Sequence, residues 1–214
     1  MFSDHYFISI LLTVILFVIL FFNDDHHKID RLLLFLISFA LLSFNSYLIL
    51  TNSFSLKTHL PLHLCYITQL GIFLSIIFKS NTFYPWLLLN SLGGGITGLL
   101  NSDLDSGALF IEFLYFYMSH FNILLFAIYL WKQNYVIKKT DFFKSIFFNS
   151  IFFIFVIFLN FFLDSNYWFT KDKPNGINLT NILPEWPYYL IILIFIGIIS
   201  YCITFKLFNQ RLRK

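Results

Sequence analysis

The chain has 214 residues, of which 58% are hydrophobic and only 12% are charged. Soluble domains carry roughly 25% charged residues, and no soluble core could bury so much apolar surface. The composition therefore excludes a soluble globular domain and predicts an integral membrane protein. The formal net charge of +3 is small, and we expect it to reflect membrane topology, with no nucleic acid as a partner.

Seven apolar stretches are long enough to be membrane spans, each of which needs about 20 predominantly apolar residues. They cover residues 6–22, 32–50, 62–78, 83–100, 108–131, 146–163 and 188–208. The first lacks a basic start and a small-residue cleavage site, which favours a retained span over a signal peptide. The sequence predicts an all-α polytopic bundle of about seven transmembrane helices, forming one transmembrane domain over residues 1–214.

The distribution of lysine and arginine predicts the orientation, because cytoplasmic loops keep an excess of positive charge. With seven spans, one side collects 11 of the 14 basic residues: Lys28, Arg31, Lys79, Lys132, Lys138, Lys139, Lys144, Lys206, Arg211, Arg213 and Lys214. The opposite side holds only Lys57, Lys171 and Lys173. We therefore expect the N-terminus outside and the C-terminus in the cytoplasm.

Polar residues gather at the predicted outer face. This face collects His5, His59, His63, Cys65, Asn101, Asp103 and the long link from Asp164 to Trp186. The aromatic residues of that link suit the membrane interface. The link is therefore interpreted either as an interfacial cap or as a lid over a polar cavity.

The third span combines a proline, a histidine and a cysteine. Because proline suits the first helical position, we expect this helix to begin near Pro61. On such a helix Cys65 shares a face with Thr68 and Gln69, whereas His63 points elsewhere. A base for the Cys65 thiol would then come from another element, and His120 is the candidate.

The fifth span carries His120 near its middle, with Glu112 and Ser119 close to the same face. An acid, a hydroxyl and an imidazole along one side of a membrane helix predict an internal polar seam. Such a seam is either functional or a set of hydrogen bonds between helices. The spacing of Gly94 and Gly98 in the fourth span predicts close helix packing.

The two cysteines cannot form a disulfide in this topology. Cys202 lies about 20 Å deeper than Cys65 at 1.5 Å of rise per residue, and we expect it to be a small buried hydrophobe. Cys65, near a helix N-terminus, is either a packed, inert thiol or a reactive one. The residue spacing indicates no metal site and no cofactor.

Six ordered segments resemble the YwaF and transmembrane protein 164 family of polytopic membrane proteins. They are Phe2-Ser3-Asp4-His5, Leu60-Pro61-Leu62-His63-Leu64-Cys65, Gly98-Leu99-Leu100-Asn101-Ser102-Asp103-Leu104, Ser119-His120 with Ile128-Tyr129-Leu130, Asn166-Tyr167, and Trp186-Pro187-Tyr188. The likeness covers nearly the whole chain. It departs from the animal members at Leu62: there, the cysteine directly follows the proline.

The resemblance implies a membrane acyltransferase that moves a fatty acyl chain between glycerophospholipids through a cysteine acyl-enzyme. Carried over, Cys65 is the nucleophile, His120 the general base and acid, and His63 or Asn101 stabilises the oxyanion. The expected substrate-binding residues are His5, Asn101, Asp103, Glu112, Asn166, Tyr167 and Trp186. For the bacterial branch of the family, the resemblance implies no particular activity.

Three hypotheses follow for a multi-pass protein of the cell membrane with membrane lipids as partners. The first is this lipid acyltransferase, or transacylase. The second is a non-catalytic carrier or receptor whose internal polar site is built from His63, Glu112 and His120. The third is a structural membrane component.

Overall fold

A computed structural model describes residues 2–23, 25–104, 107–174 and 179–209. These residues form seven α-helices and two short 3-10 helices, and none of them lies in a strand. The α-helices are α1 (Phe2–Phe22), α2 (His26–Leu50), α3 (Leu64–Ile77), α4 (Tyr84–Leu100), α5 (Phe110–Lys132), α6 (Lys139–Leu163) and α7 (Tyr188–Asn209). The 3-10 helices are η1 (Tyr167–Phe169) and η2 (Leu179–Ile182). The prediction of an all-helical protein is confirmed.

Five helices are long and apolar enough to cross a membrane, namely α1, α2, α5, α6 and α7. A helix suits a lipid environment because it pairs its own backbone N–H and C=O groups. The other two helices are shorter: α3 has 14 residues and α4 has 17. At 1.5 Å per residue they extend roughly 21 and 26 Å, against about 30 Å for the hydrocarbon core of a bilayer.

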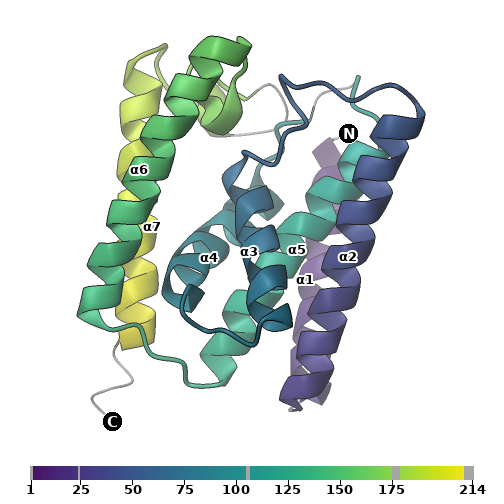
Figure 1. Cartoon of the computed structure of the whole chain (residues 1–214), viewed down its shortest axis with the longest axis vertical. Helices are drawn as coiled ribbons and strands as arrows, with labels where there is room; N and C mark the ends of the chain where they lie inside the picture. The colour runs from purple at the N-terminus through teal and green to yellow at the C-terminus, as the bar shows by residue number, and fades with distance from the viewer. Residues whose placement is uncertain (1, 24, 105–106, 175–178, 210–214) are drawn as a thin grey trace.

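Successive helices run in alternating directions, so the polar segments gather at the two ends of the bundle (Figure 1). We call one end the loop end; it holds the start of α1 and the segments that precede α3, α5 and α7. The opposite end holds the described basic residues Lys28, Arg31, Lys79, Lys132, Lys138, Lys139, Lys144 and Lys206. The remaining basic residues of that predicted group, Arg211, Arg213 and Lys214, lie outside the described residues.

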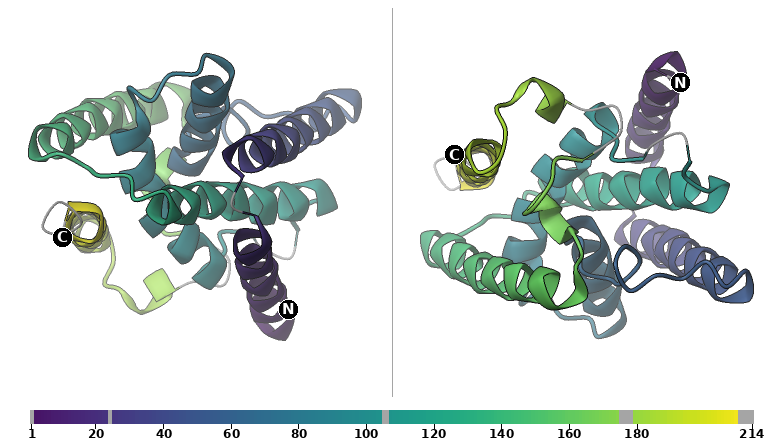
Figure 2. Two further views of the ribbon diagram at one scale, coloured as in Figure 1. Left: turned by 90° about the horizontal axis from the view of Figure 1, so that it is seen from below. Right: turned by 90° about the horizontal axis from the view of Figure 1, so that it is seen from above.

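The central helix of the bundle is α5, which lies between α1 and α2 with α6 and α7 farther away (Figure 2). Its closest neighbour is α4, which approaches through glycine. A Cβ atom on Gly95 would lie 2.8 Å from Leu124 Cβ, and one on Gly98 would overlap the ring of His120. On another side of α4, a Cβ on Gly93 would overlap Ser200 of α7. Close helix packing is therefore confirmed at Gly98, whereas Gly94 makes only an ordinary contact, 3.6 Å from Ile123.

The outer helices present large apolar side chains on their exposed faces, as expected of helices that face lipid. Phe161 of α6 is 78% exposed and Phe195 of α7 is 61% exposed. Cys202 also lies on the exposed face of α7, so the prediction that it is a buried hydrophobe is wrong. The positions that α7 buries are Tyr189, Thr204 and Phe208, and Cys202 lies off that face. Both cysteines are free thiols, as predicted.

The prediction that the third helix begins near Pro61 is wrong. The helix begins at Leu64, and His63 is its N-cap with an extended backbone (ψ 141°). The chain before it is held by the segment that follows α6: the indole Nε1 of Trp168 donates to the Leu62 carbonyl at 2.6 Å. Pro61 and Leu62 lie in a turn that this tertiary contact holds, so the helix preference of Pro61 is overridden.

Candidate functional site

A cluster of ionisable side chains lies around Asp103 at the loop end. Asp103 lies near enough to the imidazoles of His63 and His120 and to the thiol of Cys65 for electrostatic interaction with each. His63 and His5 lie near His120 as well. Three helices and one loop therefore bring these residues together, although they are far apart in the sequence.

The orientation of His120 is fixed by its own helix and by α4. Its Nδ1 lies 2.7 Å from the carbonyl oxygen of Phe116. A carbonyl can only accept, so Nδ1 carries the proton and donates it, which leaves Nε2 of the neutral ring as an acceptor. The ring lies directly against Gly98, where a Cβ would come within 1.9 Å of Cδ2. His120 is thus buried and held in the tautomer that can take a proton through Nε2.

His63 and Cys65 lie at the start of α3, under the segment that follows α6. The His63 ring makes an edge contact with Tyr167, with centroids 5.0 Å apart, and lies 5.6 Å from Phe169. Burial lowers the pKa of His63 below its ordinary value, and the charge of Asp103 opposes this shift. The Cys65 side chain is half-buried. The covering segment thus contacts His63, whereas Cys65, two residues further along, packs against the apolar core.

The covering segment, residues 164–174, is fastened to the chain before α3. The Tyr167 hydroxyl donates to the Leu56 carbonyl at 2.8 Å and accepts from the Leu60 N–H at 2.9 Å. Tyr167 is fully buried, and this burial raises its pKa. At the surface Lys57 contacts Asp164 at 2.8 Å and holds the pKa of that carboxyl below its usual value. These contacts close residues 164–174 over His63.

One buried amide of α6 organises this segment. Asn160 Oδ1 accepts from the Ser165 hydroxyl and the Tyr167 N–H, while Nδ2 donates to the Tyr167 carbonyl and the Thr170 hydroxyl. Trp168 then takes a left-handed backbone (φ 59°) that is uncommon for a residue with a side chain. The network of Asn160 therefore holds a strained turn in place above the cluster.

Three residues predicted to bind substrate take part in fastening the loop end. Asn166 Oδ1 accepts from the Lys171 and Asp172 N–H groups. Asn101 links the end of α4 to η2 by accepting from the Leu179 N–H. Trp186 is 60% exposed and donates through Nε1 to the Thr170 carbonyl.

Glu112 lies away from the His120 cluster, in the first turn of α5. Its Oε2 accepts from the Leu109 N–H, and its Oε1 lies 3.1 Å from His59 Nε2. His59 Nδ1 accepts from the Ser55 N–H, so Nε2 carries the ring proton and donates it to the carboxylate. Glu112 therefore stabilises the start of α5, and its contacts do not join it to His63 and His120.

His5 lies between the cluster around Asp103 and a cavity beside α1. Its Nδ1 is 2.8 Å from the Tyr117 hydroxyl, and its ring contacts Phe116, on which the His120 ring also packs. The side chain is buried. His5 therefore contacts the surroundings of His120 on one side and lines the cavity beside α1 on the other.

Two further residues lie around the cluster: Gln69, which the helix spacing places on the face of Cys65, and Tyr115, which carries no signal in the sequence. Gln69 is fully buried, and neither of its amide atoms has a hydrogen-bond partner within the described chain. Tyr115 is buried near Cys65, and its ring contacts that of Tyr66 with centroids 5.3 Å apart. Gln69 lies one helical turn beyond Cys65, and this spacing is the signal that identifies it as a neighbour of the thiol. Nothing in the sequence distinguishes Tyr115 from the many other aromatic residues.

A metal centre has no support within the residues that the structure describes, since no three His, Cys, Asp or Glu side chains there could hold one ion. The fold and the buried ionisable cluster define a multi-pass helical membrane protein with a polar site at one end. The family model described as TMEM164 family matches residues 1–205, and the chain belongs to that family. No curated protein and no solved structure matches the chain.

Proposed function

We propose that this protein is a membrane lipid acyltransferase in which Cys65 forms a thioester with an acyl chain taken from a glycerophospholipid. The observation that carries the proposal is the arrangement around Asp103. Asp103 lies near enough to Cys65, His63 and His120 for electrostatic interaction with all three, in a membrane protein whose sequence resembles acyl-transferring relatives. Ionisable groups at membrane depth are costly, and their convergence favours a functional site.

In the proposed first step, the Cys65 thiol gives its proton to His120 Nε2 and its sulfur attacks the ester carbonyl of the donor lipid. The ester C–O bond breaks, the thioester C–S bond forms, and the alkoxide leaving group takes the proton from His120. In the second step a hydroxyl of the acceptor lipid gives its proton to His120 and attacks the thioester. The thiolate then leaves and regains the proton. The Nδ1–H bond to Phe116 supports this role because it leaves Nε2 free to accept.

The positive charges at the end opposite the cluster support an N-terminus outside the cytoplasm. In that orientation the cluster lies near the outer leaflet of the cell membrane. Lipid substrates would then approach laterally. The covering segment would limit water, which competes with the acceptor hydroxyl for the thioester.

The test uses the Cys202→Ser protein, in which Cys65 is the remaining thiol, incubated in nanodiscs with a phospholipid carrying an alkyne-tagged acyl chain. We expect a tagged acyl group on the peptide that contains residue 65, released by neutral hydroxylamine as a thioester. Cys65→Ser should show no such release. Acyl transfer that persists in Cys65→Ser, or no acyl group on Cys65 under any donor, would contradict the proposal.

A further inference from the structure

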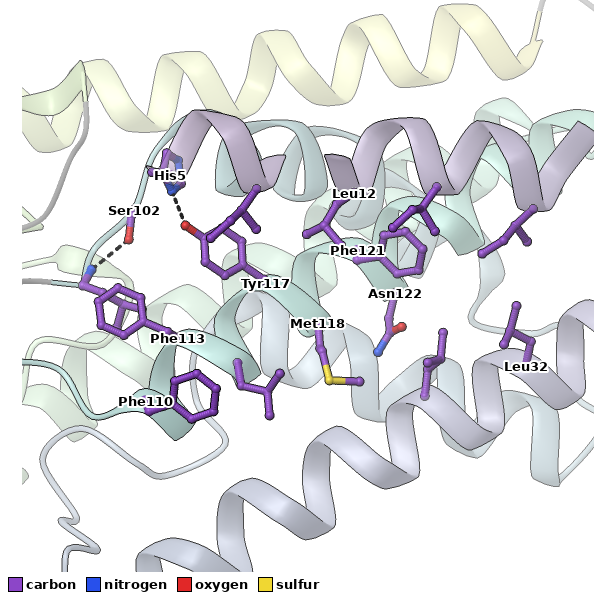
Figure 3. A pocket seen from close by; sticks show the side chains of 16 residues that line it. His5, Leu12, Leu32, Ser102, Phe110, Phe113, Tyr117, Met118, Phe121 and Asn122 are labelled. Atoms are coloured by element: carbon purple, nitrogen blue, oxygen red, sulfur yellow. Dashed lines mark hydrogen bonds between the residues drawn. The ribbon is translucent and has the colours of Figure 1, made fainter. Parts of the chain in front are cut away.

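A cavity lies beside α5, on the side away from His120. It has a volume of about 670 Å³ and is walled by α1, α2 and α5 (Figure 3). This volume falls within the range of small-molecule sites. His120 instead faces α4 at Gly98, so the two sites use different faces of α5.

The cavity is long and mostly apolar. Along α1 its wall extends from His5 to Ile19, which is 14 steps along the helix and therefore about 21 Å at the helical rise. Leu12 and Leu36 are among the aliphatic residues that line it. A narrow apolar space of this length suits a hydrocarbon chain.

One end of the cavity is polar. His5 and Tyr117 are joined there by a hydrogen bond of 2.8 Å, and Ser102 lies beside them in Figure 3. This is the loop end of the bundle. The apolar wall along α1 is therefore bounded by polar side chains at this end.

Asn122 interrupts the apolar wall partway along the cavity. Its side chain points into the space between α1 and α2 (Figure 3) and is 0% exposed. Among the described residues, neither its Oδ1 nor its Nδ2 has a hydrogen-bond partner. A buried amide without hydrogen-bond partners is unfavourable, so we expect a ligand atom to form hydrogen bonds with it. It lies five residues from Tyr117, or about 7.5 Å along α5.

We propose that this cavity binds a lipid with a single hydrocarbon chain, and that a hydroxyl or protonated carboxyl group of that lipid bonds to both amide atoms of Asn122. Such groups donate and accept at once, which matches the amide, whereas an ester carbonyl can only accept. Binding of this kind does not require acyl transfer at Cys65. The site therefore adds to the proposed function and does not rest on it.

The test is photo-crosslinking of the full chain in nanodiscs with a long-chain alcohol that carries a diazirine and an alkyne. Unlabelled long-chain alcohol, fatty acid and fatty acid methyl ester serve as competitors. We expect saturable crosslinks on peptides of α1, α2 and α5. Asn122→Leu should weaken competition by the alcohol, the acid or both by about fivefold or more, and competition by the methyl ester by less than about twofold. If competition by the alcohol weakens, Asn122 binds a hydroxyl group. If competition by the acid weakens, Asn122 binds a carboxyl group.

Asn149→Leu on α6 is the matched control, because it makes the same substitution at an asparagine that lies outside the cavity. Leu36→Trp fills the cavity from α2 and should abolish saturable crosslinking while leaving acylation at Cys65 intact. If Asn122→Leu does not fold, Asn122→Ser keeps a group that donates and accepts and should retain the preference for alcohol or acid over ester. Crosslinks that do not saturate, or an equal loss of all three competitors in a folded Asn122→Leu protein, would overturn the proposal.

Discussion

Gly98→Ala is the sharpest perturbation of the site that a single methyl group can make. The added Cβ would lie 1.9 Å from Cδ2 and 2.4 Å from Nε2 of His120. Neither atom can stay where it is, so the imidazole must rotate or α4 must withdraw from α5. Either movement displaces the ring that the Phe116 carbonyl holds through Nδ1.

The expected magnitude follows from three contributions. Overpacking of a well-packed interior costs about 1–3 kcal/mol, and loss of the Nδ1–H bond costs about 1 kcal/mol. Alanine is better than glycine in a helix by about 1 kcal/mol, which offsets part of the loss. We therefore expect Gly98→Ala to lower the free energy of unfolding by about 1–3 kcal/mol.

The assay is reversible unfolding in mixed micelles by titration with SDS, followed by circular dichroism. Two glycines are matched controls: a Cβ on Gly197 meets nothing within 4 Å, and one on Gly94 lies at an ordinary 3.6 Å from Ile123. Alanine at either position should be neutral or stabilising by up to about 1 kcal/mol. If Gly98→Ala is as stable as these controls and leaves acylation of Cys65 unchanged, the described packing of the His120 ring against Gly98 is incorrect.

Two further predictions concern the loop end and the orientation. Asn160→Leu removes the four hydrogen bonds that hold residues 165–170 and should cost at least about 3 kcal/mol, with faster amide hydrogen exchange there. Asn149→Leu on the same helix should leave that exchange unchanged, and equal exchange in both variants would refute the role of Asn160. In a cysteine-free background, a membrane-impermeant maleimide applied to intact cells should label Lys57→Cys and spare Lys79→Cys. The reverse pattern would invert the proposed orientation.

The helices were predictable because lipid imposes one simple rule on the sequence. A long apolar stretch must form a helix, and the predicted spans overlap all seven observed α-helices. Helix starts were less predictable: α6 begins at Lys139, seven residues before the predicted span, because a helix can extend into the polar region beyond the apolar stretch. The close contact at Gly98 also followed from composition, since small residues let helices approach.

The site was only partly predictable. The alternation of spans predicts that His63, Cys65 and Asp103 share one end, and the position of His120 within a span marks it as unusual. The fastening role of Tyr167, the pairing of Glu112 with His59 and the cavity at Asn122 depend on contacts between distant segments. No local pattern encodes such contacts, so these features required the structure.

The most direct test of the central claim is the rate at which the Cys65 thiol becomes acylated, measured by intact-protein mass spectrometry in the wild type and in His120→Ala. General base catalysis typically contributes about 10²–10⁴-fold. The account predicts one acyl group per chain, attached at residue 65, and formation at least about 100-fold slower in a folded His120→Ala protein. Equal rates in the two proteins, or acylation at another residue, would contradict it.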